Sequence, residues 1–240
     1  MKLLNQSKIK LEMSGYIMLL NKARTLVEGR EIMTSMRNHG VMLGMVSYSV
    51  LLKKAITLIE GYAIITMMRK EGIAPNVVIY SILLNKAQSL DEGCATVAIM
   101  RKNGIKPNVI IYNKLLSKSN TFKEGRIIID DMRNNGIKPD VVTYTTLLTK
   151  SHTLEQGRTV LMCMRKDGIT PDAHTYGILL KYALSTQDVE ELLACMNMDC
   201  VVFNSYHLRA VERLFSLDLS CDSQKLWAEL HNRGQAQIIH

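Results

Sequence analysis

Residues 103–134 read NGIKPNVIIYNKLLSKSNTFKEGRIIIDDMRN, and five positions in this stretch recur along the chain at one constant interval. The tyrosines fall at Tyr16, Tyr48, Tyr80, Tyr112, Tyr144 and Tyr176, and the methionines at Met36, Met68, Met100, Met132, Met164 and Met196. One glycine series is Gly29, Gly61, Gly93, Gly125 and Gly157, and a second is Gly40, Gly72, Gly104, Gly136 and Gly168. The prolines are Pro75, Pro107, Pro139 and Pro171. Five columns that share one 32-residue period predict tandem copies of a single structural unit, because a biased composition would not keep them in phase.

Each unit is predicted to form two helices, as its third copy illustrates. Tyr80 is followed by leucines at i+3 and i+4, which places an apolar stripe on a first helix. The segment 90–104, LDEGCATVAIMRKNG, carries a second stripe. Ser89 and Glu92 form a capping box at its start, in which the hydroxyl accepts from a free amide and the carboxylate reaches back to the cap amide. The same box recurs at Thr25 and Glu28, Thr57 and Glu60, Thr121 and Glu124, and Thr153 and Gln156.

The two glycines of a unit have separate predicted roles. Gly93 lies on the stripe of the second helix, where glycine costs about 1 kcal/mol relative to alanine, so we expect it to allow close approach of the two helices of its unit. Gly104 is expected to end the second helix in a left-handed conformation, and Pro107 separates it from the next unit. One unit cannot bury its stripes alone. The predicted fold is therefore all-α, a right-handed α-solenoid superhelix of tandem helix–turn–helix repeats.

The repeats divide the chain into three parts. Residues 1–12 form an N-terminal lead-in, and six repeats are predicted to span residues 13–199. Their bounds are about 13–44, 45–76, 77–108, 109–140, 141–172 and 173–199. Residues 200–240 are expected to form an irregular seventh repeat or C-terminal helical cap, because terminal repeats commonly degenerate. Phe203 is interpreted as its aromatic start, and Trp227 as a cover for exposed core.

Composition narrows the classes of partner and compartment. A net charge of +8 favours an anionic partner such as nucleic acid. The five cysteines include no C-x-x-C pair, and we expect reduced thiols packed as small apolar residues in an intracellular compartment. A zinc site from Cys195, Cys200, Cys221 and His231 has the wrong spacing, so no metal is predicted.

Targeting and catalytic signals are both missing from the sequence. No run of about 18 apolar residues is present, so we expect no membrane association through a spanning helix. The first twelve residues lack the apolar block of a secretory signal. We expect a cytoplasmic protein if the sequence is full length, with the mitochondrion or plastid as the alternative if a transit peptide precedes it. Phosphate-loop, dinucleotide-binding and zinc-protease motifs do not occur, so we predict that the protein is not an enzyme and needs no cofactor. We also expect a monomer.

Three segments resemble the pentatricopeptide repeat family. They are EGIAPNVVIYSILL (71–84), NGIKPNVIIYNKLL (103–116) and NGIKPDVVTYTTLL (135–148). The resemblance covers roughly residues 13–199. This chain departs from the family in one systematic way, because its repeats are three residues shorter. The deletion falls in the back half of the first helix and removes about 0.8 of a helical turn.

The resemblance implies binding of single-stranded RNA, with one base per repeat. Family members read each base with the residue after the tyrosine and with the last residue of the unit. Here the pairs are Ser49 with Asn76, Ser81 with Asn108, Asn113 with Asp140, and Thr145 with Asp172. The family's correspondences give A-A-U-G from 5′ to 3′. The first unit (Ile17, Gly44) and the sixth (Gly177, Asp199) offer no readable pair.

Two further columns carry roles implied by the resemblance. The residue two before the tyrosine packs against the base, and here these residues are Val46, Val78, Ile110, Val142 and His174. A lysine column lies near the phosphates in the family. Its members are Lys22, Lys54, Lys86, Lys118 and Lys150. A row of positive charge along one groove suits a phosphate chain.

Alternative interpretations exist for each column. Asn76, Asn108, Asp140 and Asp172 precede a first helix, where Asn and Asp are favoured caps. The residues after the tyrosines are equally compatible with plain surface positions, and the lysines with ordinary solvated side chains. The alternative for the whole chain is a scaffold that binds other proteins through its concave face, without RNA specificity.

Overall fold

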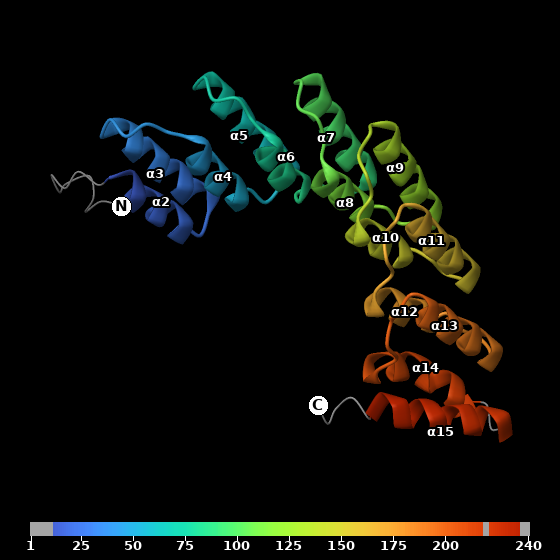
Figure 1. Cartoon of the computed structure of the whole chain (residues 1–240). Helices are drawn as coiled ribbons and strands as arrows, with labels where there is room; N and C mark the ends of the chain where they lie inside the picture. Colours follow the sequence, from blue (N-terminus) through green and yellow to red (C-terminus); the bar gives the residue numbers. More distant parts are fainter. Residues whose placement is uncertain (1–11, 218–220, 236–240) are drawn as a thin grey trace. The chain divides into compact units, whose positions relative to one another are not determined.

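The computed structural model describes residues 12–217 and 221–235, and the regular elements among them are all helices (Figure 1). The first helices of successive repeats are α2 (Met13–Lys22), α4 (Met45–Lys54), α6 (Val77–Leu84), α8 (Val109–Ser117), α10 (Val141–Leu148), α12 (Ala173–Leu180) and α14 (Ser205–Leu217). The second helices are α3 (Leu26–Asn38), α5 (Leu58–Lys70), α7 (Leu90–Lys102), α9 (Phe122–Asn134), α11 (Leu154–Lys166), α13 (Thr186–Met198) and α15 (Cys221–Gln235). The prediction of an all-α fold is confirmed. The lead-in, apart from its last residue, lies outside the described residues.

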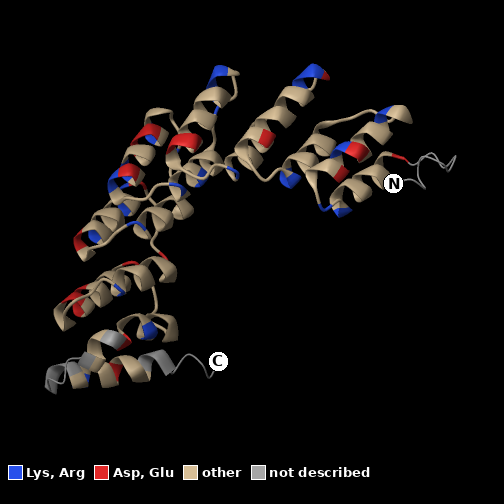
Figure 2. Cartoon of the chain, turned by 180° about the vertical axis from the view of Figure 1, so that it is seen from behind, with Lys and Arg blue, Asp and Glu red and all other residues tan. Residues whose placement is uncertain are grey.

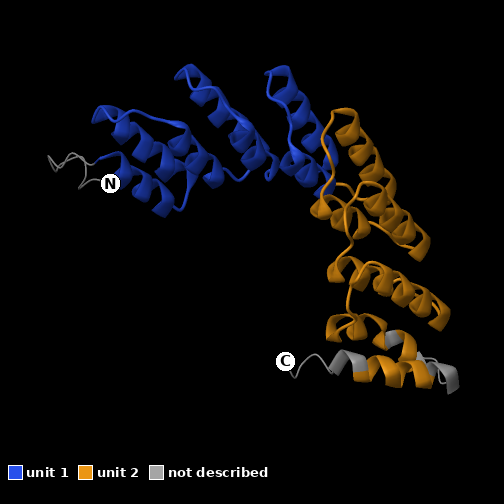
Figure 3. Cartoon of the chain, viewed as in Figure 1, with its two compact units in different colours: residues 1–118 blue, residues 119–240 orange. Residues whose placement is uncertain are grey.

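The chain divides into two compact units, residues 1–118 and 119–240 (Figure 3). In the first unit, α2, α4, α6 and α8 contact one another in sequence, and α3, α5 and α7 each contact the first helix that follows. In the second unit, α10, α12 and α14 form the same kind of row, with α11 and α13 beside it. Within each unit, first helices therefore pack against first helices of neighbouring repeats.

Three side-chain columns fill the core. The six tyrosines and the six methionines of the repeat are at most 1% exposed. The second leucine of each first helix from α2 to α12, such as Leu84 and Leu148, is buried as well. Full burial of a side chain of this size stabilises the fold by about 1.5–3 kcal/mol. The apolar stripes of the sequence thus form the core.

All five predicted cap hydroxyls are in place, but a complete capping box is found at two of the five positions, at the starts of α5 and α9. Each of the five Ser or Thr hydroxyls accepts from the amide three residues later, at 3.2 Å. In two boxes the cap amide donates back to the carboxylate, from Thr57 to Glu60 and from Thr121 to Glu124. In the other three boxes, the described bond goes to the amide one residue earlier. Those amides belong to Arg24, Gln88 and His152.

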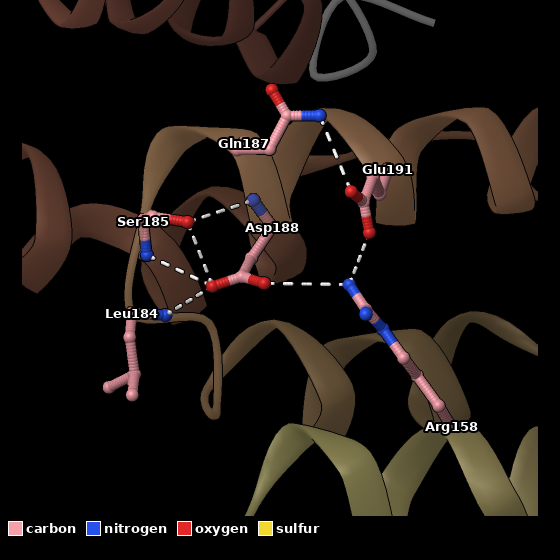
Figure 4. A network of polar contacts seen from close by, with 6 residues as sticks. All are labelled: Arg158, Leu184, Ser185, Gln187, Asp188 and Glu191. Atoms are coloured by element: carbon pink, nitrogen blue, oxygen red, sulfur yellow. Dashed lines mark hydrogen bonds and ion pairs between the residues drawn. The ribbon is translucent and has the colours of Figure 1, made fainter.

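Complete boxes also begin α10, α12 and α13, where the sequence analysis did not anticipate them. The box of α13 lies beside an ion pair that joins two repeats. Ser185 accepts from the Asp188 amide at 3.1 Å, and the Asp188 carboxylate accepts from the amides of Leu184 and Ser185 (Figure 4). Arg158 of α11 pairs with Asp188 and Glu191, which joins the second helices of two neighbouring repeats. An Asp at the third position performs the role for which the pattern required Glu or Gln.

The second helices end as the second glycine series predicts. Gly40, Gly72, Gly104, Gly136 and Gly168 all have φ between 69° and 74°. Gly104 donates its amide to the Arg101 carbonyl at 2.9 Å, and Ile105 donates to the Met100 carbonyl at 3.1 Å. These two hydrogen bonds satisfy carbonyl groups that would otherwise lack a partner at the end of the helix. Cys200 occupies the same place after α13 with φ of 56°, in a region that a non-glycine residue rarely adopts.

The first glycine series has a different neighbour from the one predicted. A Cβ added to Gly93 would lie 2.8 Å from Leu115 Cδ1 in the next repeat, but 3.8 Å from Leu84 Cδ1 in its own repeat. Gly29 and Gly157 show the same preference for the leucine of the following first helix. The prediction of close approach within a unit was therefore wrong. The glycine permits close packing between successive repeats.

A polar column that the sequence analysis missed surrounds the buried tyrosines. The Tyr80 and Tyr112 hydroxyls accept from Arg69 and Arg101 of the preceding second helix, at 3.2 Å and 2.6 Å. The Tyr176 hydroxyl accepts from Arg165 and donates to Asp199 at 2.5 Å. The arginine recurs with the period of the repeat and follows the methionine, so the period contained the signal.

The same contacts shift the pKa values of Tyr176 and Asp199 in opposite directions. Burial raises the pKa of the Tyr176 phenol far above its ordinary value, and the hydrogen bond to Asp199 raises it further. Burial alone would raise the pKa of Asp199, but the hydrogen bonds from Arg165 and Tyr176 outweigh it and lower that pKa. The Asp199 carboxylate is thus held in its charged form.

The seventh repeat keeps the register of the earlier repeats into α14. Asn204 caps this helix, as Asp172 caps α12, and accepts from the amides of Tyr206 and His207. Phe203 therefore occupies the position of Pro171, and Leu208 that of the repeat tyrosine. The assignment of Phe203 as the aromatic start of the repeat was wrong. Phe203 is nevertheless buried.

The seventh repeat also has a longer first helix than the repeat before it. Helix α12 ends at Leu180, in the eighth position after its cap, whereas α14 continues to Leu217, in the thirteenth position after its cap. The additional residues lengthen the helix in the region where the other repeats are short. The Trp227 ring of α15 packs on Phe215 of α14, with centroids 5.2 Å apart.

The expectation that the cysteines pack as core residues was wrong for two of them. Cys94 and Cys200 are exposed, and Cys163 and Cys195 are half-buried. The side chain of Cys221 lies outside the described residues.

We predict that Gly93→Val lowers the thermal unfolding midpoint, because the added methyl groups overlap Leu115. The expected cost is about 1–3 kcal/mol, as for other overpacked cores. Adding Leu115→Ala to the same chain removes the overlapping methyls. Circular dichroism melts of the two single variants and the double variant measure the coupling, and strict additivity would contradict the contact between repeats.

We predict that Gly44→Asp stabilises the chain by about 0.5–1 kcal/mol. Gly44 caps α4 without a side chain, has room for a Cβ, and precedes Ser47, whose buried Oγ has no hydrogen-bond partner. An aspartate there can bond the Ser47 amide and hydroxyl, as Asp140 bonds Thr143. Gly44→Ala is the control in the same denaturant titration. A midpoint no higher for the aspartate than for the alanine would contradict the capping argument.

We predict that stability falls in acid through Asp199. Its pKa is lower in the folded chain than the unfolded value of about 3.9. Its contribution is therefore complete above that value and is lost as the pH falls below it through the folded pKa. The Asp199→Asn variant should have a free energy of unfolding about 1–2 kcal/mol lower at pH 7. Its melting temperature should also fall less steeply than that of the wild type as the pH is lowered. Parallel acid limbs for the two proteins would argue against this role.

Candidate nucleic-acid interface

Helices α6, α8, α10 and α12 begin with the same arrangement, and this arrangement positions four of the predicted reading residues. Asn76 and Asn108 accept through Oδ1 from the amides of Ile79 and Ile111, both at 3.1 Å. Asp140 and Asp172 accept from the amides of Thr143 and Thr175, both at 2.8 Å. All four last-position residues are thus helix caps, as the alternative interpretation proposed.

The cap occupies only part of each side chain. Asn76 and Asn108 use Oδ1 in the cap, while Nδ2 takes no part in it. An amide of this kind offers two further donors. Burial alone would raise the pKa of Asp172, but hydrogen bonds from Thr175 outweigh it and lower that pKa, so this cap is anionic. Capping and recognition of a base edge are therefore chemically compatible.

The second reading position lies one residue after each buried tyrosine. Ser49, Ser81, Asn113 and Thr145 are all half-buried. The Ser49 hydroxyl donates to the Val46 carbonyl at 2.8 Å, and the Thr145 hydroxyl donates to the Val141 carbonyl at 2.9 Å. Because a hydroxyl keeps lone pairs and rotates, both groups still accept from a ligand.

Three of the four predicted pairs lie on helices that contact each other. Ser49 and Asn76 are on α4 and at the start of α6, and Ser81 and Asn108 are on α6 and at the start of α8. Thr145 and Asp172 are on α10 and at the start of α12. Asn113 and Asp140 belong to different compact units, so their pairing remains a prediction.

Aliphatic side chains stand exposed at one repeated position of the first helices. Val46, Val78, Ile110 and Val142 are 59, 56, 53 and 56% exposed. Single exposed apolar residues are common on protein surfaces. The same β-branched position left uncovered in four successive repeats is different, because it presents an apolar face once in each of these repeats. Such faces suit the planes of nucleobases.

Two lysines of the column hydrogen-bond the C-terminal end of the preceding first helix. Lys54 Nζ donates to the Asn21 carbonyl at 2.8 Å, and Lys86 Nζ donates to the Lys53 carbonyl at 3.1 Å. Each of these bonds satisfies a terminal carbonyl of the preceding first helix. An ammonium group has three donors, so the bond does not exhaust it. Lys22 is exposed, while Lys118 and Lys150 are half-buried.

A further lysine near this column was not predicted. Lys114 Nζ donates to Asn85 Oδ1 at 2.5 Å, which joins α8 to the end of α6. Burial lowers the pKa of Lys114, and the neighbouring charge of Lys118 lowers it further. The position lacks a lysine in the other repeats, so the period gave no signal for it.

Charge is distributed unequally between the two kinds of helix. None of α2, α4, α6, α8, α10 and α12 contains Asp or Glu, whereas each of the second helices that follow them does (Figure 2). In these first helices and their caps, the only carboxylates are Glu12, Asp140 and Asp172. The surface that carries the exposed aliphatic column thus combines lysines with few acidic groups, which favours an anionic ligand.

Residues 12–217 and 221–235 contain neither of two other kinds of site. No group of three or more His, Cys, Asp or Glu side chains is placed to hold a metal ion there. No helix in this part of the chain is both long and apolar enough to cross a membrane.

Stacked helix pairs with repeated surface columns define an α-solenoid repeat protein. The family profile of the pentatricopeptide repeat domain matches residues 59–89, 90–120 and 127–183. The chain belongs to the pentatricopeptide repeat family.

Solved structures agree on the fold. The pentatricopeptide repeat protein PPR10 from maize is 20% identical, with a TM-score of 0.69 over 98% of this chain and 39% of that one. PPR10 in complex with an 18-nt psaJ RNA element is also 20% identical, with a TM-score of 0.53 over 95% of this chain and 42% of that one. The α-solenoid prediction is confirmed. This chain spans about two fifths of PPR10, and no curated protein sequence matches it.

Proposed function

We propose that this chain is a non-catalytic, sequence-selective binder of single-stranded RNA. The observation that carries the proposal is the column Val46, Val78, Ile110 and Val142, exposed in register on first helices that contain no carboxylate. Each member lies three residues before a half-buried polar side chain and two residues after a helix cap. Each of the second to fifth repeats therefore offers an apolar face and a polar side chain, and the cap of the next first helix supplies a second polar group.

Each part of an RNA nucleotide finds a complementary group. A base stacks on the aliphatic face, and its Watson–Crick edge reaches the residue after the tyrosine and the cap of the next first helix. The lysines at the ends of the first helices lie on the same row of helices and attract phosphates. PPR10, which shares this fold, was solved with an RNA element, so the fold is compatible with RNA binding.

The readable repeats define a short target. The second and third repeats, with Ser and Asn, favour adenine. The fourth, with Asn113 and Asp140, favours uracil, and the fifth, with Thr145 and Asp172, favours guanine. The preferred sequence is A-A-U-G from 5′ to 3′. Occupying such a site would act on RNA stability, processing or translation by blocking access to the strand, in whichever compartment holds the protein.

We predict that Asn113→Thr shifts the third base of the target from uracil toward guanine. Fluorescence anisotropy with labelled single-stranded RNAs that contain A-A-U-G or A-A-G-G measures the change, and a reversal of about tenfold in relative affinity is expected. Asn134→Thr makes the same chemical change on an exposed position of α9 and serves as control. Affinity should also fall as salt rises.

Two outcomes would count against the proposal. An unchanged preference in Asn113→Thr would contradict the assignment of the reading pair. No binding to any single-stranded RNA at low salt would contradict the function as a whole, and would leave a scaffold for other proteins as the interpretation.

A further inference from the structure

The exposed column of the first helices changes character at its C-terminal end. Continuing the register of the repeats from Val142 gives His174 and then Tyr206. Both belong to the second compact unit, in the first turns of α12 and α14. His174 is exposed, and Tyr206 is 39% exposed. Two aromatic rings thus replace the aliphatic side chains at the last two positions.

These two rings contact each other directly. Their centroids are 6.1 Å apart with planes inclined by 25°, and the Tyr206 hydroxyl lies 3.2 Å from His174 Nδ1. Stacked rings in proteins have centroids about 4.5–7 Å apart. A base inserted between His174 and Tyr206 would need that distance to each ring, or roughly twice the separation seen. The pair therefore leaves no space for a base between its members.

The reading position of the sixth repeat is covered by the same tyrosine. Gly177 follows Tyr176 and corresponds to Ser49, Ser81, Asn113 and Thr145. A Cβ added at Gly177 would overlap the Tyr206 ring, with Cδ1 and Cζ at 2.9 Å and Cε1 closer still. Glycine is the residue that permits this contact, because it lacks the atom that would collide. Tyr206 lies where another repeat has its reading side chain.

The backbone of Tyr206 is held in this position from both sides. Its amide donates to Asn204 Oδ1 at 3.0 Å, within the cap of α14. The next residue, His207, is fully buried, and its Nε2 hydrogen-bonds the Ala173 carbonyl at 2.8 Å. Its Nδ1 accepts from the Asn204 amide at 3.1 Å. The first turn of α14 is therefore attached to the first turn of α12.

We propose that Tyr206 is an end stop of the RNA track: it fills the base position of the sixth repeat and confines sequence reading to the second to fifth repeats. This inference rests on the proposed RNA-binding function. It also corrects the sixth pair, because the cap in register with Asp172 is Asn204, whereas Asp199 caps the end of α13 and pairs with Arg165. The sixth repeat thus has a usable cap residue and lacks the other half of a reading pair.

The wild-type chain supplies the first test. Labelled RNAs carry A-A-U-G followed at the 3′ side by each of the four bases, in an otherwise constant strand. The end stop predicts dissociation constants within about twofold of one another. A preference of fivefold or more for one following base would overturn it while leaving RNA binding intact. Failure of every RNA to bind would overturn the end stop and the proposed function together.

Opening the site supplies the second test. The double variant Gly177→Asn, Tyr206→Val restores an aliphatic face and a reading side chain beside Asn204. It should acquire a preference of about fivefold or more for one following base. Tyr206→Val alone opens the site without a reading group and is the matched control, expected to bind all four RNAs alike. A double variant that melts cooperatively and shows no preference would overturn the proposal, and if it does not fold, the wild-type result decides.

Discussion

The packing of a leucine from one repeat onto a glycine of the preceding repeat determines the rest of this structure. Leu115 approaches Gly93 so closely that a single added carbon would lie 2.8 Å from it. Because the glycine and the leucine recur with the same period, this contact holds a second helix against the first helix of the next repeat within each compact unit. In the first unit, the contact of Gly61 with Leu83 thereby fixes where α6 lies, and with it the intervals between Val46 and Val78 and between Ser49 and Asn76.

Polar groups serve more than one purpose in this arrangement. Asn76 and Asn108 cap the N-termini of α6 and α8 through Oδ1, and their side-chain amides still offer a donor to a ligand. Lys54 and Lys86 satisfy terminal carbonyls of the preceding first helix, and each ammonium group has further donors. A folding role therefore does not exclude a binding role at these positions. The arginines beside the buried tyrosines show the other case, because Arg165 is occupied by Tyr176 and Asp199.

Periodicity predicted the features that depend on one repeat, and it failed for several that depend on neighbouring repeats. The helix pairs, the left-handed glycines and the cap hydroxyls follow from local pattern, so they could be read from any one copy. The packing partner of Gly93 could not be read in this way, because the apolar stripe of the second helix is equally compatible with packing against a helix of its own repeat or of the next repeat. The closed site at Gly177 was missed for a similar reason. Tyr206 is recognised as the equivalent of His174 only when Asn204 is aligned with the cap Asp172, and the interpretation of Phe203 as the aromatic start of the repeat prevented this alignment.

Site-specific crosslinking tests most directly whether the row of first helices holds the RNA. A single-stranded RNA with 4-thiouridine at the third base of A-A-U-G is irradiated with the wild-type chain, and the labelled peptide is identified by mass spectrometry. The account predicts attachment within α8, close to Ile110 and Asn113. Attachment on the second helices α7 or α9, with α8 unlabelled, would contradict it.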